Sequence, residues 1–148
     1  MFASDEAIID GSPMVIYKAI LNEYAGHTHW WPSQESKLQG NVPFDSEGAI
    51  VEIIIHSERA RGTPRFCYKL TKMVEGKSID VEVTGDIEGT GKWTFEPTNG
   101  KTKVQFQWDV RPKRLLYVIL SPFVDMAKIH SDVMQKGYMA LNSYLKEK

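Results

Sequence analysis

The chain has 148 residues, a length that fits one domain spanning residues 1–148, because two domains would each be small for a self-sufficient core. Its composition, 42% hydrophobic and 25% charged, is typical of a globular protein. The net charge of −1 argues against a dedicated nucleic-acid binder, which needs a basic surplus to neutralise phosphates.

The N-terminal part predicts one strand and two short helices. The apolar run 7–9 is expected to form the strand. Ser12 can cap a helix that begins at Pro13, where the missing N–H costs nothing, and helical spacing continues to about Asn22. A second short helix is expected over about 24–31.

From residue 49 the apolar period changes to two, which is typical of antiparallel strands with one buried and one wet face. The run 49–56 is the first of these strands, and turn sequences at 75–77, 88–91 and 99–100 separate later ones. We therefore expect a meander and a sheet of about six or seven strands. The inward side chains that alternation predicts in it are Phe66, Tyr68, Leu70, Ile79, Val81, Val83, Trp93, Phe95, Val104, Phe106, Trp108 and Val110.

The C-terminal segment predicts one long amphipathic helix, whose apolar stripe must find a covering surface. Such a helix, following a one-sided sheet, is expected to lie across it, which makes the fold α+β. The residues of the stripe are Phe123, Met126, Ala127, His130, Val133, Met134, Gly137, Tyr138, Leu141, Tyr144 and Leu145.

This order of elements resembles the START-like (SRPBCC) superfamily, and within it the polyketide cyclase/dehydrase and lipid-transport group. The segments that carry the resemblance are 9–17, 30–32, 85–93, 100–104 and 130–141. The resemblance implies a helix-grip fold: a curved antiparallel sheet closed by the terminal helix over an apolar cavity for lipids, sterols, polyketides or similar molecules. Periodicity alone leaves a filled core equally open.

A cavity between helix and sheet would be lined by large rings that hold the helix away and by adaptable methionines. We expect a volume of a few hundred Å³, the usual scale for small-ligand sites. No catalytic residue, cofactor or metal is assigned. The predicted ligand-binding residues are Tyr68, Val81, Val83, Trp93, Phe95, Phe106, Trp108, Met126, His130 and Met134.

His130 lies on the apolar stripe and has two interpretations. It could bond a ligand or move a proton, with the inward hydroxyl of Tyr68 completing the polar end of the cavity. Alternatively, it is a core histidine bonded to a neighbouring strand or to Tyr68. The best-defined strands show no second acid on an inward face, so the sequence favours a binder over an enzyme.

Other polar groups carry weaker hypotheses. His27 and His29 have no third ligand nearby, which favours surface histidines over a metal site. The arginines of the 59–65 loop (Arg59, Arg61 and Arg65) could attract an anionic head group or an acidic partner, or be simply solvated. Cys67 is the single cysteine, which excludes a disulfide framework and favours an unreactive strand thiol.

The sequence favours binding or carriage of a small apolar molecule. The alternatives are a cyclase- or dehydratase-like enzyme using His130 as general acid–base, and a co-chaperone-like interaction module. The start of the chain lacks signal-peptide features, and the longest apolar run, 115–120, is far below the roughly 20 residues of a membrane span. We therefore expect a cytoplasmic monomer or homodimer with no integral membrane segment and no nucleic-acid partner.

Overall fold

The computed structural model describes residues 2–56, 63–112 and 126–147. Within these ranges a seven-stranded antiparallel sheet has the order β1-β7-β6-β5-β4-β3-β2, and two helices accompany it. The strands are β1 (Phe2–Ile9), β2 (Gln34–Gln39), β3 (Ile50–Ile55), β4 (Arg65–Val74), β5 (Ser78–Gly85), β6 (Ile87–Thr98) and β7 (Lys101–Pro112). The helices are α1 (Pro13–Ala25) and α3 (Met126–Lys146).

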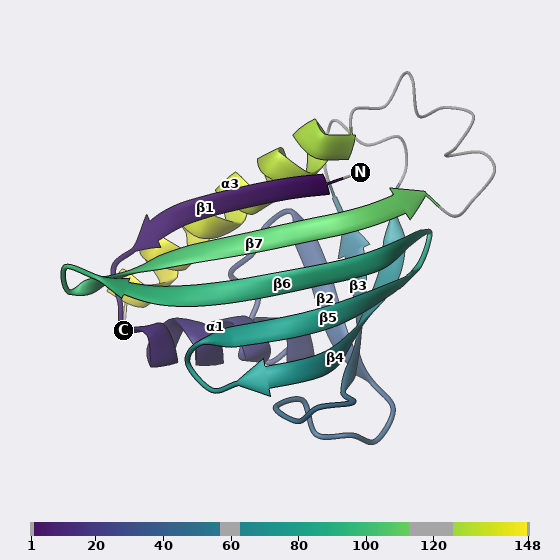
Figure 1. The fold of residues 1–148 in the computed structure, drawn as a ribbon, viewed down its shortest axis with the longest axis horizontal. Helices are drawn as coiled ribbons and strands as arrows, with labels where there is room; N and C mark the ends of the chain where they lie inside the picture. Colours follow the sequence, from purple (N-terminus) through teal and green to yellow (C-terminus); the bar gives the residue numbers. More distant parts are fainter. Residues whose placement is uncertain (1, 57–62, 113–125, 148) are drawn as a thin grey trace.

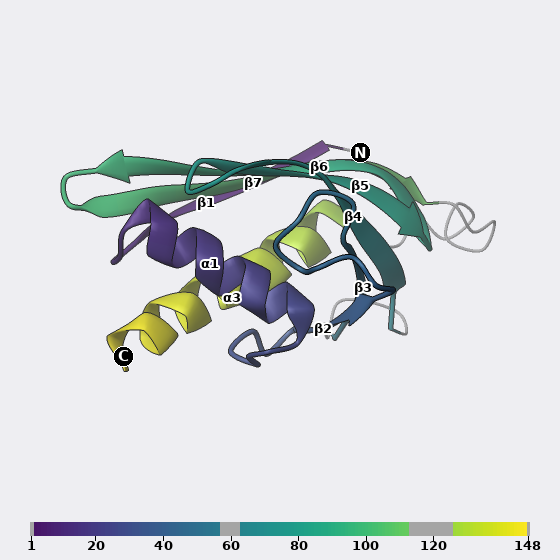
Figure 2. The same cartoon turned by 90° about the horizontal axis from the view of Figure 1, so that it is seen from below.

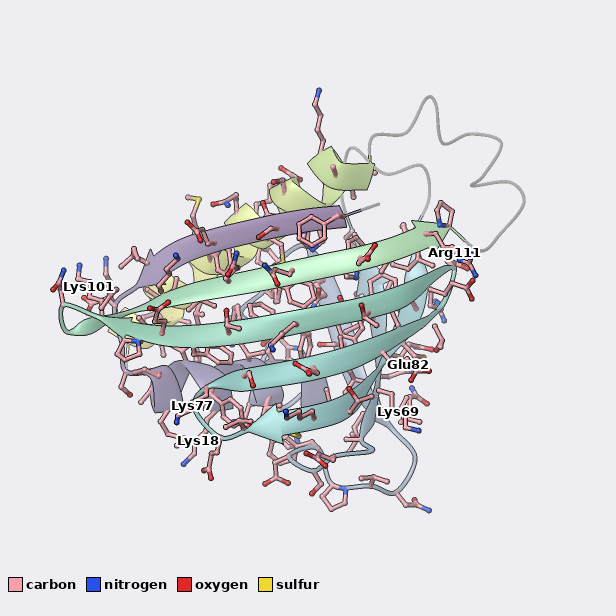
Figure 3. All side chains as sticks on the ribbon, viewed as in Figure 1. Lys18, Lys69, Lys77, Glu82, Lys101 and Arg111 are labelled. Atoms are coloured by element: carbon pink, nitrogen blue, oxygen red, sulfur yellow. The ribbon has the colours of Figure 1, made fainter. Side chains whose placement is uncertain are left out.

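The sheet is strongly curled, and both helices lie on its concave side (Figures 1 and 2). Charged side chains such as Lys69 and Glu82 cover the opposite, convex face (Figure 3). This arrangement is the predicted α+β helix-grip fold, with the apolar sides of sheet and helix facing each other.

The predicted strand register is confirmed. The pairing of β6 with β7 sets Trp93 opposite Phe106 and Phe95 opposite Val104, and all four side chains are buried. Gln107, one residue out of phase, is exposed on the other face. Because a slip of one residue would exchange the two faces, the alternation alone was enough to orient these strands.

The prediction of two short helices before the sheet is wrong in the described residues, where a single helix, α1, runs three residues past Asn22. Ser12 caps its start as expected, and Gly26 ends it in the left-handed conformation, with φ of 81°. The following loop is held instead by Glu23, whose buried carboxylate accepts bonds from the Thr28 hydroxyl and from the backbone N–H groups of Trp30 and Trp31. These bonds satisfy N–H groups that a helix would otherwise have paired.

Two strands differ from the prediction. β1 begins at Phe2 rather than at residue 7, because residues 2–9 pair along their whole length with β7. β2 was not predicted, since its sequence, Gln34–Gln39, is polar and lies at the edge of the sheet. Neither segment carries the apolar alternation on which the prediction depended.

Two of the three predicted turns are correct and the third is wrong. Residues 75–77 form the predicted turn between β4 and β5. Asn99 and Gly100 form the predicted hairpin turn, with φ of 48° and 80°. Residues 88–91, however, lie inside β6, and the chain reverses at Asp86 instead. Gly89 is required by close approach, because a Cβ there would lie 2.0 Å from the carbonyl oxygen of Asp109 on β7.

The terminal helix buries most of its predicted stripe against the sheet: Val133, Met134, Tyr138 and Leu141 are all buried. Ala127 is an exception and is exposed, so the stripe is narrower at this end than predicted. Phe123 and the side chain of Met126 lie outside the described residues.

Candidate functional site

A small cavity lies between α3 and the sheet, with a volume of about 40 Å³. This space holds roughly one to three water molecules, so the described residues do not enclose the predicted volume of a few hundred Å³ between α3 and the sheet. Its lining residues are Tyr24, Trp31, Gln34, Ile55, Phe66, Tyr68, Phe106, Trp108, Ile129, His130, Val133 and Met134.

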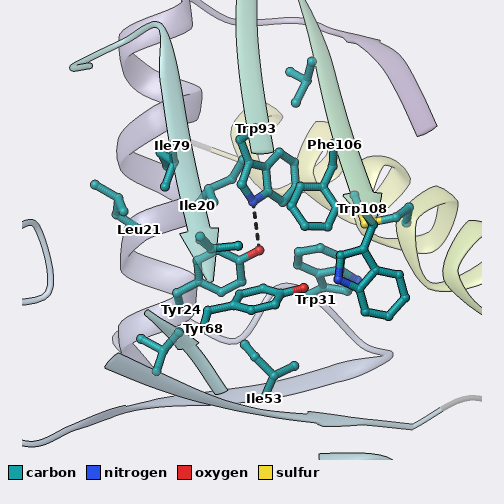
Figure 4. Packing of buried hydrophobic residues seen from close by; sticks show 14 of the residues in the cluster. Ile20, Leu21, Tyr24, Trp31, Ile53, Tyr68, Ile79, Trp93, Phe106 and Trp108 are labelled. Carbon is teal, nitrogen blue, oxygen red and sulfur yellow. Dashed lines mark hydrogen bonds between the residues drawn. The ribbon is translucent and has the colours of Figure 1, made fainter. Parts of the chain in front are cut away.

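Aromatic rings account for the small size, because they fill the interior as well as separating helix from sheet (Figure 4). The ring centroids of Trp93 and Phe106 are 4.7 Å apart, and those of Tyr24 and Tyr68 are 5.6 Å apart. Trp93 donates through Nε1 to the Tyr24 hydroxyl at 2.9 Å, so its polar atom is paired inside the core.

Five of the ten residues predicted to bind a ligand line the cavity: Tyr68, Phe106, Trp108, His130 and Met134. Four others, Val81, Val83, Trp93 and Phe95, are buried in the surrounding core without lining it. The side chain of the tenth, Met126, lies outside the described residues.

His130 is paired with a carboxylate that the sequence analysis missed. Its Nδ1 lies 2.8 Å from Oδ2 of Asp5, and the exposed fractions of the two side chains are 5% and 7%. The hydroxyl of Ser131 donates to the other carboxylate oxygen, Oδ1. The Tyr138 hydroxyl donates to the backbone carbonyl of Asp5 at 2.8 Å, which anchors β1 to α3 at this point.

The sequence analysis found no second acid on an inward face of the best-defined strands, but β1, which was not among them, supplies one. In β1 the buried positions are Ala3, Asp5 and Ile9, with half-buried Ala7 in the same phase. Asp5 shares that phase, but the short side chains around it hide the alternation. The one feature of the sequence that could have indicated this acid is that Asp5 shares the phase of Ala3 and Ala7.

Asp5 is held in its charged form. Burial alone would raise the pKa of its carboxyl group, but hydrogen bonds from His130 and Ser131 and the charge of His130 outweigh it, and the pKa lies below the ordinary value. A carboxylate can only accept hydrogen bonds, so the proton between it and His130 must sit on Nδ1. In a neutral imidazole this leaves Nε2 as a bare acceptor.

Nε2 of His130 is buried and has no hydrogen-bond partner in the described part of the chain. Two more atoms of the cavity wall are buried without a hydrogen-bond partner among the described residues: Nε1 of Trp108 and Nε2 of Gln34. The hydroxyl of Tyr68 also makes no hydrogen bond to described residues, and burial raises its pKa well above the ordinary value. Buried polar atoms are normally paired, so this concentration around one cavity marks it as a candidate binding site.

The cavity lies next to an outer groove of about 510 Å³ beside β2. Trp31 and Gln34 line both spaces and thus form the wall between them. On the groove side lie Glu35 and His56, with Nε2 of His56 3.2 Å from Oε1 of Glu35.

The other candidate residues do not gather into a site. His27 bonds to Asn22, and no group of three possible metal-ligating residues occurs among the described residues. Arg65 lies 3.9 Å from Glu52, whereas Arg59 and Arg61 lie outside the described residues. Burial and the charge of Glu52 raise the pKa of the half-buried Cys67 thiol, which makes it less reactive.

No protein-family profile and no curated protein matches this sequence. Solved structures do resemble the fold. A START superfamily protein from Mycobacterium smegmatis aligns with a TM-score of 0.74 at 14% identity, covering 99% of this chain and 97% of the other. Ginseng major latex-like protein 151 from Panax ginseng aligns with a TM-score of 0.72 at 10% identity, covering 97% of this chain and 96% of the other.

The Aha1 dimer from Colwellia psychrerythraea is also similar, with a TM-score of 0.60, 18% identity and 96% coverage of both chains. These likenesses show that the chain has a START-like helix-grip fold, as the resemblance implied. None of the helices in the described ranges is long and apolar enough to cross a membrane.

Proposed function

We propose that this chain binds a small, mainly apolar molecule in the cavity between α3 and the sheet. The observation that carries the proposal is the unpaired, buried Nε2 of His130 in a mainly apolar wall. An atom in this position gains a hydrogen bond only if something enters the cavity, and an apolar body would gain from contact with the rings around it.

The ligand range we propose is lipid-, sterol- or polyketide-like, in keeping with START-like neighbours. Any such molecule exceeds the 40 Å³ present, so binding requires side chains to move. Met134 is the best suited, because it is flexible, apolar and part of the wall. The energy of that rearrangement opposes binding, which makes shape more decisive than the apolar area buried.

A matched pair of methionines provides the test. Met134 lines the cavity, whereas Met139, five residues along the same helix, is 71% exposed. We expect the neutral dye 1-aminoanthracene to bind with increased fluorescence, Met134→Trp to weaken binding at least fivefold, and Met139→Trp to leave it unchanged. Equal effects of the two substitutions, or no dye binding, would contradict a ligand site in this cavity. Native mass spectrometry of freshly purified protein then identifies any molecule that it carries.

A second function, acid–base catalysis in the same cavity, is favoured by the pair of Asp5 and His130. The carboxylate fixes the tautomer and orientation of the imidazole, and the opposite nitrogen is left free to take a proton. The test is deuterium uptake from solvent at the acidic C–H of a bound ketone, 2-tetralone. Faster uptake with the wild-type protein than with His130→Gln supports catalysis, and equal uptake supports binding alone.

Three further predictions remain as they stood: a cytoplasmic location, a monomer or homodimer, and no nucleic-acid partner. The co-chaperone-like alternative also stays a prediction. Fold alone is shared by proteins of many functions, so the cavity has priority in the tests.

A further inference from the structure

We propose that the polar end of this cavity selects a hydroxyl group, so that its ligand is an apolar alcohol or phenol rather than an ether, ketone or carboxylate. The inference rests on the proposed binding function and specifies the chemistry of the ligand. It follows from the hydrogen-bonding capacity of two unpaired nitrogens, Nε2 of His130 and Nε1 of Trp108.

The imidazole of His130 has a hydrogen-bond partner at one nitrogen only among the described residues. Asp5 accepts a bond at 2.8 Å from Nδ1 of His130, and the hydroxyl of Ser131 occupies its other oxygen. The carboxylate has no proton to offer, so Nδ1 carries the hydrogen, and in the neutral form of the ring Nε2 presents a lone pair. A ligand group that meets Nε2 must therefore be a donor.

The indole of Trp108 brings a donor to the same cavity. Trp108 can only donate through Nε1, and this atom is also buried without a partner in the described part of the chain. The rings of Trp108 and His130 are stacked, with centroids 4.5 Å apart, and both line the cavity. A group placed at this end of the cavity thus meets one acceptor and one donor.

A hydroxyl is the smallest group that satisfies both, because it donates its proton to Nε2 and accepts from the indole N–H. An ether or ketone accepts from Trp108 and leaves Nε2 unpaired. A carboxylate has only lone pairs to offer, which repel the lone pair of Nε2. Its negative charge would also be repelled by the buried carboxylate of Asp5. Both alternatives keep the penalty of an unsatisfied buried polar atom.

Four ligands that share one apolar body test the inference: naphthalene, 2-naphthol, 2-methoxynaphthalene and 2-naphthoate. Affinities at pH 7.5 come from displacement of 1-aminoanthracene and from calorimetry. We expect 2-naphthol to bind about tenfold or more tightly than 2-methoxynaphthalene, as one unpaired buried group costs about that factor. 2-Naphthoate should bind most weakly of the substituted compounds.

Two variants locate the selection. Trp108→Phe keeps an aromatic ring and removes the donor. The ratio of the affinities for 2-naphthol and naphthalene should therefore fall at least threefold. Asp5→Asn lets an amide N–H face Nδ1, which permits the tautomer with hydrogen on Nε2, and the preference for naphthol over the methyl ether should disappear. Circular dichroism checks that each variant is folded.

A direct measurement does not depend on any variant folding. Nitrogen-15 spectra of the wild-type imidazole at pH 7.5 should show hydrogen on Nδ1 of His130 and a bare Nε2 that shifts when 2-naphthol binds. Hydrogen on Nε2, or equal affinities for 2-naphthol and 2-methoxynaphthalene, would overturn the hydroxyl inference while leaving the binding function intact. Failure of every compound, including naphthalene, to bind would overturn the binding function itself.

Discussion

Gly137 of α3 lies against the indole of Trp31, so closely that a Cβ at position 137 would be 2.4 Å from Cε2 of that ring. Trp31 also donates through Nε1 to the carbonyl oxygen of Val133 at 3.0 Å, one turn earlier in the same helix. Trp31 and Val133 both line the cavity. The two contacts therefore fix the loop before β2 to the terminal helix and set the position of one cavity wall.

Gly137→Ala should destabilise the protein because the added methyl group has no space. We expect the free energy of unfolding to fall by about 1–3 kcal/mol, the usual cost of overpacking. This loss comes despite the roughly 1 kcal/mol that alanine gains over glycine in a helix. Urea denaturation measures the change, with Ser143→Ala on the exposed side of α3 as control. A stabilised Gly137→Ala protein would show that the indole does not pack against the helix.

The hydroxyls of Tyr24 and Tyr68 should differ in their contribution to stability. Tyr24→Phe leaves Nε1 of buried Trp93 without its acceptor, at a cost of about 1–3 kcal/mol. Tyr68→Phe removes a hydroxyl that has no partner among the described residues, so the ligand-free protein should be as stable as before or slightly more so. Urea denaturation of both variants gives the comparison. Equal destabilisation would place a missing partner next to Tyr68.

Asp5 should make the protein sensitive to acid. Its folded pKa lies below the ordinary value of 3.8, since hydrogen bonds from His130 and Ser131 and the charge of His130 outweigh the effect of burial. The stability that its ionised form contributes is therefore present in full above that value and is lost as the pH falls through the folded pKa. The difference in unfolding free energy between the wild-type protein and Asp5→Asn should be larger at pH 7 than at pH 3.

The control for this comparison is Asp109→Asn, on the exposed face of β7. The change that it causes in the unfolding free energy should depend less on pH. A difference between wild type and Asp5→Asn that is the same at both pH values would contradict an ionised Asp5 in the folded protein.

The sequence was sufficient to predict the central sheet and the terminal helix, since these elements have clear hydrophobic periods. The inward positions of Trp93 and Phe106 follow from alternation alone, and the place of His130 on α3 follows from its spacing to Met134. Side-chain direction in a strand or helix is set by the backbone, so a long pattern determines which residues are buried.

Three features needed the structure. Asp5 lies in a strand where its inward neighbours, Ala3 and Ala7, are too small to reveal the alternation, and its pairing with His130 joins residues 125 positions apart. The loop at 27–33 depends on the buried carboxylate of Glu23, which no helix rule anticipates. Cavity volume depends on how rings interlock, and periodicity determines direction without determining the space that remains.

Methyl NMR of the methionines during a titration with 2-naphthol tests the central claim most directly. If the ligand enters the cavity, the methyl signal of Met134, which lines it, should shift and saturate, whereas that of exposed Met139 should stay in place. An unmoved Met134 signal at saturating ligand, or a shift of Met139 alone, would contradict a binding site between α3 and the sheet.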